Sequence, residues 1–166
     1  MKKNPGADVR VGSCELGMGL FADGPIPAGS LILPLAGRPF DRRDPIHATP
    51  AGANLLQTGP TTYILLMPPA VYANHSCDPN AGIRGNRNLV AIRDIAAGEE
   101  IRFDYSTTMD EEFWTLRCRC GALACRGVVT DFDQLPDALQ RRYLKLGVVQ
   151  GFIAARARRA LAAQGG

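Results

Sequence analysis

The sequence lacks the features of a membrane or secreted protein. No apolar run among its 166 residues approaches the length of about 20 residues that a transmembrane helix needs. Lys2 and Lys3 stand near the start without an apolar stretch behind them, so we expect no secretory signal. These absences favour a cytoplasmic protein, and they leave open export to a host by a route that needs no hydrophobic signal.

The sequence also lacks a strong net charge. The formal charge is +3, with 46% hydrophobic and 21% charged residues, which is typical of a single globular domain. Residues 134–166 hold six Lys/Arg against one Asp, so the mildly basic end contrasts with a mildly acidic remainder. The mildly acidic remainder suits a basic protein or peptide as a partner, and the basic end is too modest to predict nucleic acid as a direct partner.

The sequence also lacks the even number of cysteines that a set of disulfides would need. The five cysteines are an odd number, which argues against a disulfide framework. Cys118, Cys120 and Cys125 fall within eight residues, and this C-x-C-x4-C spacing is typical of a metal site.

The residue patterns predict short strands followed by helices. Short apolar runs between Gly and Pro fill residues 9–35, whereas residues 36–60 show no clear period and are expected to form an irregular insert. The pattern I-x-A-G-x-x-I occurs at 26–32 and again at 95–101, which indicates one local turn used twice. In the strand expected at 101–105, Ile101, Phe103 and Tyr105 would share one face.

Two helices are expected after the cysteines. Leu135, Leu139, Tyr143 and Leu146 repeat at helical spacing, Pro136 stands where a helix can begin, and Gly147 ends the run. Residues 152–163 read as a second helix with outward-facing arginines. No helices separate the short strands, so a parallel sheet of the dinucleotide-binding type is not expected.

Four motifs carry the chemistry. They are Gly17-Met18-Gly19, then Asn74-His75-Ser76-Cys77-Asp78-Pro79-Asn80, then Gly98-Glu99-Glu100-Ile101-Arg102-Phe103-Asp104-Tyr105, and finally the cysteine segment 118–127. In this order they resemble the cofactor loop, the N-H-S-C-x-P-N motif, the G-E-E-[IL]-x-[FY]-D-Y motif and the post-SET cysteines of SET-domain lysine methyltransferases. The resemblance covers roughly residues 9–128.

This resemblance implies a mainly β fold of short strands. It implies a SET (β-clip) domain at 9–106, a zinc-bound post-SET segment at 114–130 and a helical extension at 134–164. Residues 74–80 would thread beneath the segment before Tyr105 as a pseudoknot, bringing Asn74, His75 and Tyr105 together. Such threading is rare.

The resemblance also implies roles for individual residues. The enzyme would move a methyl group from S-adenosylmethionine to a lysine amine, as in histone-lysine methylation, with Tyr105 as the main catalytic residue. Tyr63 and Phe103 would line the lysine channel, and Phe103 in place of Tyr predicts di- or trimethylation. Cofactor binding would fall to these residues: Gly17, Met18, Gly19, Tyr72, Asn74, His75 and Tyr105.

A structural zinc ion is expected, with Cys77 as the natural fourth ligand beside Cys118, Cys120 and Cys125. A different fourth ligand such as His75, or a set of reduced buried cysteines, is the alternative. Cys14 would be a small core residue, and His47 a surface residue.

Two further functions stay open at this point. The chain could be a SET fold that binds peptides without turnover, or a structural zinc protein whose basic end contacts nucleic acid. The sequence names neither the substrate protein nor an oligomeric state.

Overall fold

The computed structural model describes residues 6–112 and 114–163. The Met1–Pro5 segment and Gln164, the last residue of the expected helical extension, lie outside this range. Among the described residues, no helix is both long and apolar enough to span a bilayer.

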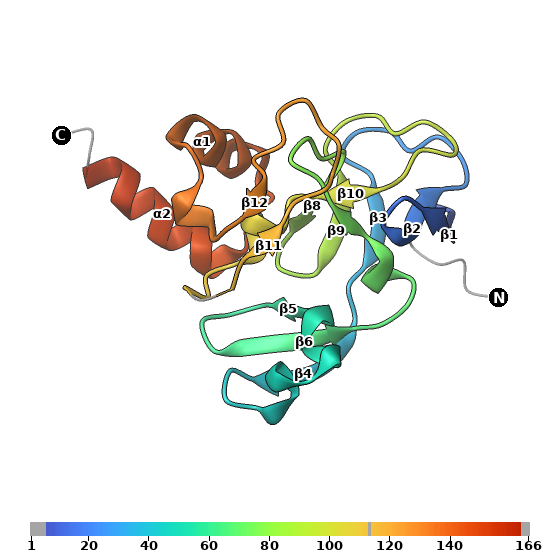
Figure 1. Cartoon of the computed structure of the whole chain (residues 1–166). Helices are drawn as coiled ribbons and strands as arrows, with labels where there is room; N and C mark the ends of the chain where they lie inside the picture. The colour runs from blue at the N-terminus through green and yellow to red at the C-terminus, as the bar shows by residue number, and fades with distance from the viewer. Residues whose placement is uncertain (1–5, 113, 164–166) are drawn as a thin grey trace.

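The fold consists of small sheets followed by two helices (Figure 1). β1 (Val9–Cys14) and β2 (Gly17–Ala22) form an antiparallel hairpin. β3 (Leu31–Pro34), β9 (Asn88–Ala91) and β8 (Ala81–Arg84) form one three-stranded sheet in that order. β7 (Asn74–His75) pairs with β10 (Arg102–Phe103), and β11 (Leu116–Arg117) pairs with β12 (Val128–Val129).

The expected irregular insert is partly wrong. β4 (Gly37–Asp41) and β5 (Leu55–Gln57) flank β6 (Thr62–Leu66) in a second three-stranded sheet. Between β4 and β5 the chain forms two short 3-10 turns, and residues 42–44 and 58–60 of the described insert follow the strands without regular structure. β4 carries Pro39, which an edge strand tolerates because one side of its backbone needs no partner. Because proline is rare in strands, Pro39 makes the sequence of β4 look like a loop.

The repeated I-x-A-G-x-x-I turn is confirmed, and the two copies pair with each other. Ile26 N donates to Ile95 O and Ile95 N to Ile26 O, both at 2.9 Å. Gly29 and Gly98 have φ of 83° and 80°, a conformation that favours glycine. Around this pair lies the main apolar cluster, which includes Leu20, Ile32, Ile83 and Ile101.

Both predicted helices are present. α1 (Asp137–Leu146) ends where Gly147 adopts a left-handed conformation with φ of 68°. α2 (Gly151–Ala163) follows, and both helices lie at the side of the molecule opposite the β1–β2 hairpin (Figure 1). Tyr143 and Ile153 are buried in a second apolar cluster that joins the helices to the sheet through Val90.

Candidate active site and metal centre

Two motifs 24 residues apart lie side by side. β7 runs parallel to β10, with Asn74 opposite Arg102 and His75 opposite Phe103. Asn80 fastens the pair, since its Nδ2 donates to Glu100 O at 2.8 Å and its Oδ1 accepts from Arg102 N at 2.9 Å. The parallel pairing is the arrangement that the predicted pseudoknot requires, and it carries Asn74 and His75 to the start of the Tyr105 turn.

Tyr105 lies at this meeting point, but not on a strand as expected. β10 ends at Phe103, and Asp104 caps a 3-10 turn, Tyr105–Thr108. The Tyr105 ring centroid is 5.4 Å from that of His75 and 4.8 Å from that of Phe103. Its hydroxyl donates to Ala73 O at 3.0 Å. The expected proximity of residue 105 to the Asn–His pair is therefore confirmed.

The Tyr105 phenol stays protonated. Burial, and then the nearby Glu100 charge, raise its pKa to about 12. A hydroxyl with such a pKa orients a neighbouring group as a donor or acceptor and does not act as a base at neutral pH.

The expected cofactor residues gather on the hairpin side of Tyr105. Asn74 Nδ2 donates to Met18 O at 3.0 Å and to Glu100 Oε1 at 2.9 Å. Gly17 and Met18 are exposed at the start of β2 and not in a loop, and a Cβ on Gly17 would meet nothing within 4 Å. A Cβ on Gly19 would come within 2.7 Å of Glu100 Oε1, so a side chain at this position would displace the Glu100 carboxylate. Half-buried Tyr72 lies in the 3-10 turn Ala70–Tyr72 packed against β2.

A cavity of about 230 Å³ opens on the other side of Tyr105. Phe103 and Tyr105 form part of its wall together with Met109 and Trp114, and Glu111 adds a carboxylate. Tyr63, expected in the channel wall, is not among the residues that line this cavity; it is buried, with its ring 4.6 Å from that of His47, edge to face. His47 is half-buried at the surface and also lines the cavity, a role that no sequence motif marks.

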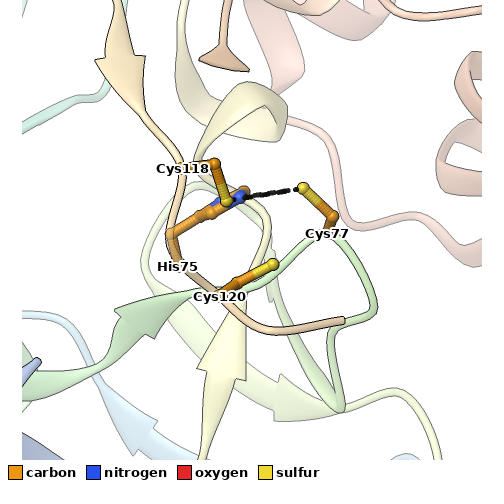
Figure 2. A group of neighbouring side chains, drawn as sticks. All are labelled: His75, Cys77, Cys118 and Cys120. Carbon is orange, nitrogen blue, oxygen red and sulfur yellow. Dashed lines mark hydrogen bonds between the residues drawn. The ribbon is translucent and has the colours of Figure 1, made fainter. Parts of the chain in front are cut away.

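A second cluster gathers histidine and cysteine side chains (Figure 2). The ligand-type atoms of His75, Cys77, Cys118 and Cys120 lie within 4.8 Å of one another, and the four side chains converge. Cys77 Sγ and Cys118 Sγ are 3.8 Å apart. Cys125 is exposed, and its thiol interacts with those of Cys118 and Cys120. Five side chains therefore compete for the four positions of a tetrahedral site.

His75 differs from the cysteines in how its ring is held. Its Nδ1 accepts a hydrogen bond from Tyr105 N at 3.2 Å, and burial lowers its pKa to about 4, so the ring is neutral. A neutral imidazole that accepts at Nδ1 carries its proton at Nε2. Nε2 lies 3.3 Å from Cys77 Sγ, which makes His75 a donor to that sulfur.

The surroundings of the sulfurs fit a metal–thiolate group. Arg126 N points to Cys77 Sγ at 3.4 Å and Gly127 N to Cys125 Sγ at 3.5 Å. Burial raises the pKa of the Cys77 and Cys118 thiols. Burial also acts on Cys120, but the backbone hydrogen bonds from Cys77 and Ala122 together with the thiols of Cys118 and Cys125 outweigh it, and the Cys120 pKa falls to about 6. The buried Nε and Nη1 of Arg126 have no hydrogen-bond partner among the described residues, while its Nη2 pairs with Asp104 Oδ1 at 2.8 Å.

The comparison with known protein families agrees with this geometry. Residues 17–106, more than half of the chain, match the SET domain. The chain belongs to the SET domain family. The predicted family and fold class are thereby confirmed, and the described zinc-type cluster and C-terminal helices extend the SET domain at its C-terminal side.

Curated relatives of this SET domain include methyltransferases. The methyltransferase flvH of Aspergillus flavus is 30% identical over 120 residues, which cover 70% of this chain and 67% of flvH. The histone-lysine N-methyltransferase ATX2 of Arabidopsis thaliana is 31% identical over 144 residues, covering 70% of this chain and 12% of ATX2. The chain thus spans only a small part of the longer relative.

Solved structures show the same fold at lower identity. KRYPTONITE, crystallised with mCHG DNA and SAH, matches 78% of this chain with a TM-score of 0.61 and 22% identity; the match covers 30% of KRYPTONITE. A humanized Polycomb Repressive Complex 2 from Chaetomium thermophilum, bound to the inhibitor GSK343, matches 64% of this chain and 16% of its own, with a TM-score of 0.56 and 24% identity. These likenesses concern the fold.

Sequence reasoning missed several residues of the site, among them three that carry a charge or a polar contact. Glu111 lines the cavity, Arg126 lies beside the cysteines, and Tyr143 reaches the site from α1. Arg126 directly follows Cys125, so its place in the cysteine motif was a usable signal, whereas nothing local marks Tyr143.

Proposed function

We propose that this SET domain transfers methyl groups from S-adenosylmethionine to the side-chain amine of a lysine in a basic protein. The observation that carries the proposal is the position of Tyr105, whose ring lies 5.4 Å from that of His75 and forms part of the wall of the cavity of about 230 Å³. Family membership and the methyltransferase relatives support it.

The donor would occupy the corner beside β2. S-adenosylmethionine supplies a methyl group activated on a sulfonium. Gly17 and Met18 are exposed there, and Gly19 lets β2 approach Glu100, while Asn74 and Glu100 offer polar atoms to an amino acid moiety. His75 and Tyr72 would complete this side of the site.

The acceptor would enter through the cavity. Aromatic and apolar walls from Phe103, Met109 and Trp114 suit the aliphatic stem of lysine and attract its cation, and Glu111 adds a negative charge that favours a basic peptide. The lysine amine must lose its proton before attack, because its pKa begins near 10.4. Since Tyr105 stays protonated, that proton leaves to water, and Tyr105 aligns the amine with the donor methyl.

Zinc would be held by Cys77, Cys118, Cys120 and Cys125. His75 then serves as a donor to the Cys77 sulfur and not as a ligand, because its free nitrogen carries the proton. The ion would fix the cysteine segment against β10, where Arg102 Nη1 already donates to Cys120 O at 3.0 Å. The expected cytoplasmic location remains part of the proposal.

The test is transfer of a labelled methyl group to a panel of basic proteins, with the product lysine mapped by mass spectrometry. We expect wild-type protein to methylate lysine and Tyr105→Phe to lose about 10²-fold in turnover while still binding S-adenosylmethionine, since misalignment alone costs that much. Peptide binding without any transfer would point to a binding module. Strongly salt-dependent DNA binding without transfer would point to a zinc protein that contacts nucleic acid.

A further inference from the structure

The residue directly before Tyr105 is a buried carboxylate that collects donors from three segments. Asp104 is 1% exposed. Its Oδ1 accepts from Arg126 Nη2 at 2.8 Å and from Ser106 N at 3.1 Å, and its Oδ2 accepts from the Tyr143 hydroxyl at 2.9 Å. A buried carboxylate is tolerated only when it is paired and hydrogen-bonded, so these donors determine where Asp104 can lie.

The donors connect distant parts of the chain to one turn. Arg126 belongs to the cysteine segment, Ser106 to the Tyr105 turn, and Tyr143 to α1, which lies outside the SET match at 17–106. Burial and then the charge of Asp104 raise the pKa of the Tyr143 phenol, so the hydroxyl keeps its proton and donates it to Oδ2.

Packing alone does not explain the Tyr143 hydroxyl. Phe132 occupies the same apolar cluster and is equally buried, so the cluster accepts an aromatic ring that lacks a polar atom. A buried hydroxyl carries a desolvation cost, which the bond to Asp104 offsets. The polar atom of Tyr143 is therefore directed to one acceptor, next to the candidate catalytic residue.

Asp104 transmits this contact to Tyr105 through the backbone. Its side chain caps the turn at Ser106 N, and its carbonyl accepts from Thr107 Oγ1 at 2.7 Å. The next residue, Tyr105, is held at its amide by His75 Nδ1 and at its hydroxyl by Ala73 O. A rotation of Asp104 would tilt the turn and displace that hydroxyl.

We propose that Tyr143 is a positioning residue for Tyr105. By holding Asp104 Oδ2, α1 fixes the turn that carries the Tyr105 hydroxyl, so the C-terminal helix takes part in the active site. The effect on turnover rests on the proposed function, whereas the effect on the turn does not.

The experiment compares Tyr143→Phe, which keeps the ring and removes one donor, with Ile153→Val as a control in the same apolar cluster. Each variant is assayed for kcat and KM in labelled-methyl transfer, for melting temperature, and for backbone amide exchange at residues 105–107. We expect Tyr143→Phe to lower kcat about tenfold or more with KM for S-adenosylmethionine within about twofold, because a small displacement of an aligned group reduces turnover steeply. Its amides 105–107 exchange faster than in wild type.

The control and a second variant complete the test. Ile153→Val loses a methylene and some melting temperature, and it should leave kcat and the exchange at 105–107 unchanged. Asp104→Asn replaces one acceptor oxygen by an NH2 group, so one of the donors loses its acceptor. This variant should show the same fall in kcat and the same faster exchange as Tyr143→Phe, and the double variant should lose little more.

Three outcomes would overturn the proposal. They are wild-type exchange and kcat in Tyr143→Phe, an equal loss of kcat in Ile153→Val at matched melting temperature, and full additivity of Tyr143→Phe with Asp104→Asn. If the wild-type protein transfers no methyl group, the proposed function fails, and the exchange rates still decide whether Tyr143 holds the turn. If Tyr143→Phe does not fold, Asp104→Asn decides by the same readouts.

Discussion

In this SET protein, the strand scaffold and the cysteine segment differ in the interactions that stabilise each of them. The scaffold buries a continuous cluster of Leu, Ile and Ala side chains around β2, β3, β8 and β9. The cysteine segment has only the two-residue strands β11 and β12, and its buried cluster consists largely of Cys77, Cys118 and Cys120. Leu123 on this segment is fully exposed.

The candidate site therefore has two parts that are stabilised in different ways. Burial of apolar surface builds the framework that places Asn74, His75 and Tyr105, and it needs no ligand. The cysteine segment buries less apolar surface, and under the proposed function a metal ion held by its thiolates would supply part of its ordering free energy. The scaffold should therefore survive changes that release the segment.

The largest expected effect is that of metal removal. Chelation of zinc should abolish methyl transfer and release amide exchange protection across residues 116–128, while the sheet of β3, β8 and β9 stays protected. Hydrogen exchange with activity on the same sample measures both. Equal loss of protection in that sheet would show that the metal stabilises the whole chain, which would contradict the difference between scaffold and cysteine segment.

The ligand set is separated by two matched variants. Cys125→Ser should lose bound zinc, because a thiolate ligand is removed. His75→Gln should keep one zinc per chain with an affinity lowered at most about 10- to 100-fold, as expected for a residue that bonds a ligand. Metal analysis of the purified proteins checks this, and zinc retained in Cys125→Ser but lost in His75→Gln would reverse the assignment.

On the scaffold side, Phe103→Tyr tests the acceptor cavity. The added hydroxyl lies beside the Tyr105 ring, where it should bond the amine and take up space that a second methyl group needs. We expect the rate of second methylation to fall about tenfold, in the range of one new hydrogen bond, with the first methylation little changed. Mass spectrometry of the product measures this, and an unaltered mixture of di- and trimethyl-lysine would remove Phe103 from the channel.

A smaller effect is expected from Glu111→Gln at the cavity wall. Loss of the carboxylate should raise KM for a basic peptide by about 3- to 10-fold, because one partly screened charge contact is removed, while kcat changes little. The neighbouring Glu112→Gln is the matched control, since Glu112 is exposed and does not line the cavity. Equal KM changes in both variants would indicate a general charge effect.

The smallest effect is expected where α2 meets the segment after Tyr105. Arg156 pairs with Asp110, and with Asp133 at 3.4 Å, but its side chain is 46% exposed. Arg156→Ala should lower the free energy of unfolding by no more than about 1 kcal/mol, as for other exposed ion pairs. Denaturant titration tests this, and a much larger loss would place α2 within the cooperative core of the scaffold.

The sequence predicted the elements whose signals are local. Helical spacing and Gly147 predicted α1, and the order of the four motifs predicted that Tyr105 meets His75. β4 was not predicted because Pro39 interrupts the residue pattern of a strand. The 3-10 turn at Tyr105 was not predicted because the alternating residues 101–105 indicate a strand, whereas the Asp104 side chain caps a turn there. The bond between Tyr143 and Asp104 joins residues 39 positions apart, and no local pattern reports such a contact.

The central claim is that a scaffold-borne Tyr105 and a zinc-held segment together form one lysine methylation site. The most direct measurement is labelled-methyl transfer from S-adenosylmethionine to a basic protein, followed in one sample before chelation, after chelation and after zinc is restored. The account predicts transfer to lysine, its loss and its recovery. Transfer that continues unchanged without zinc, or no transfer by the zinc-loaded protein to any member of the panel, would contradict it.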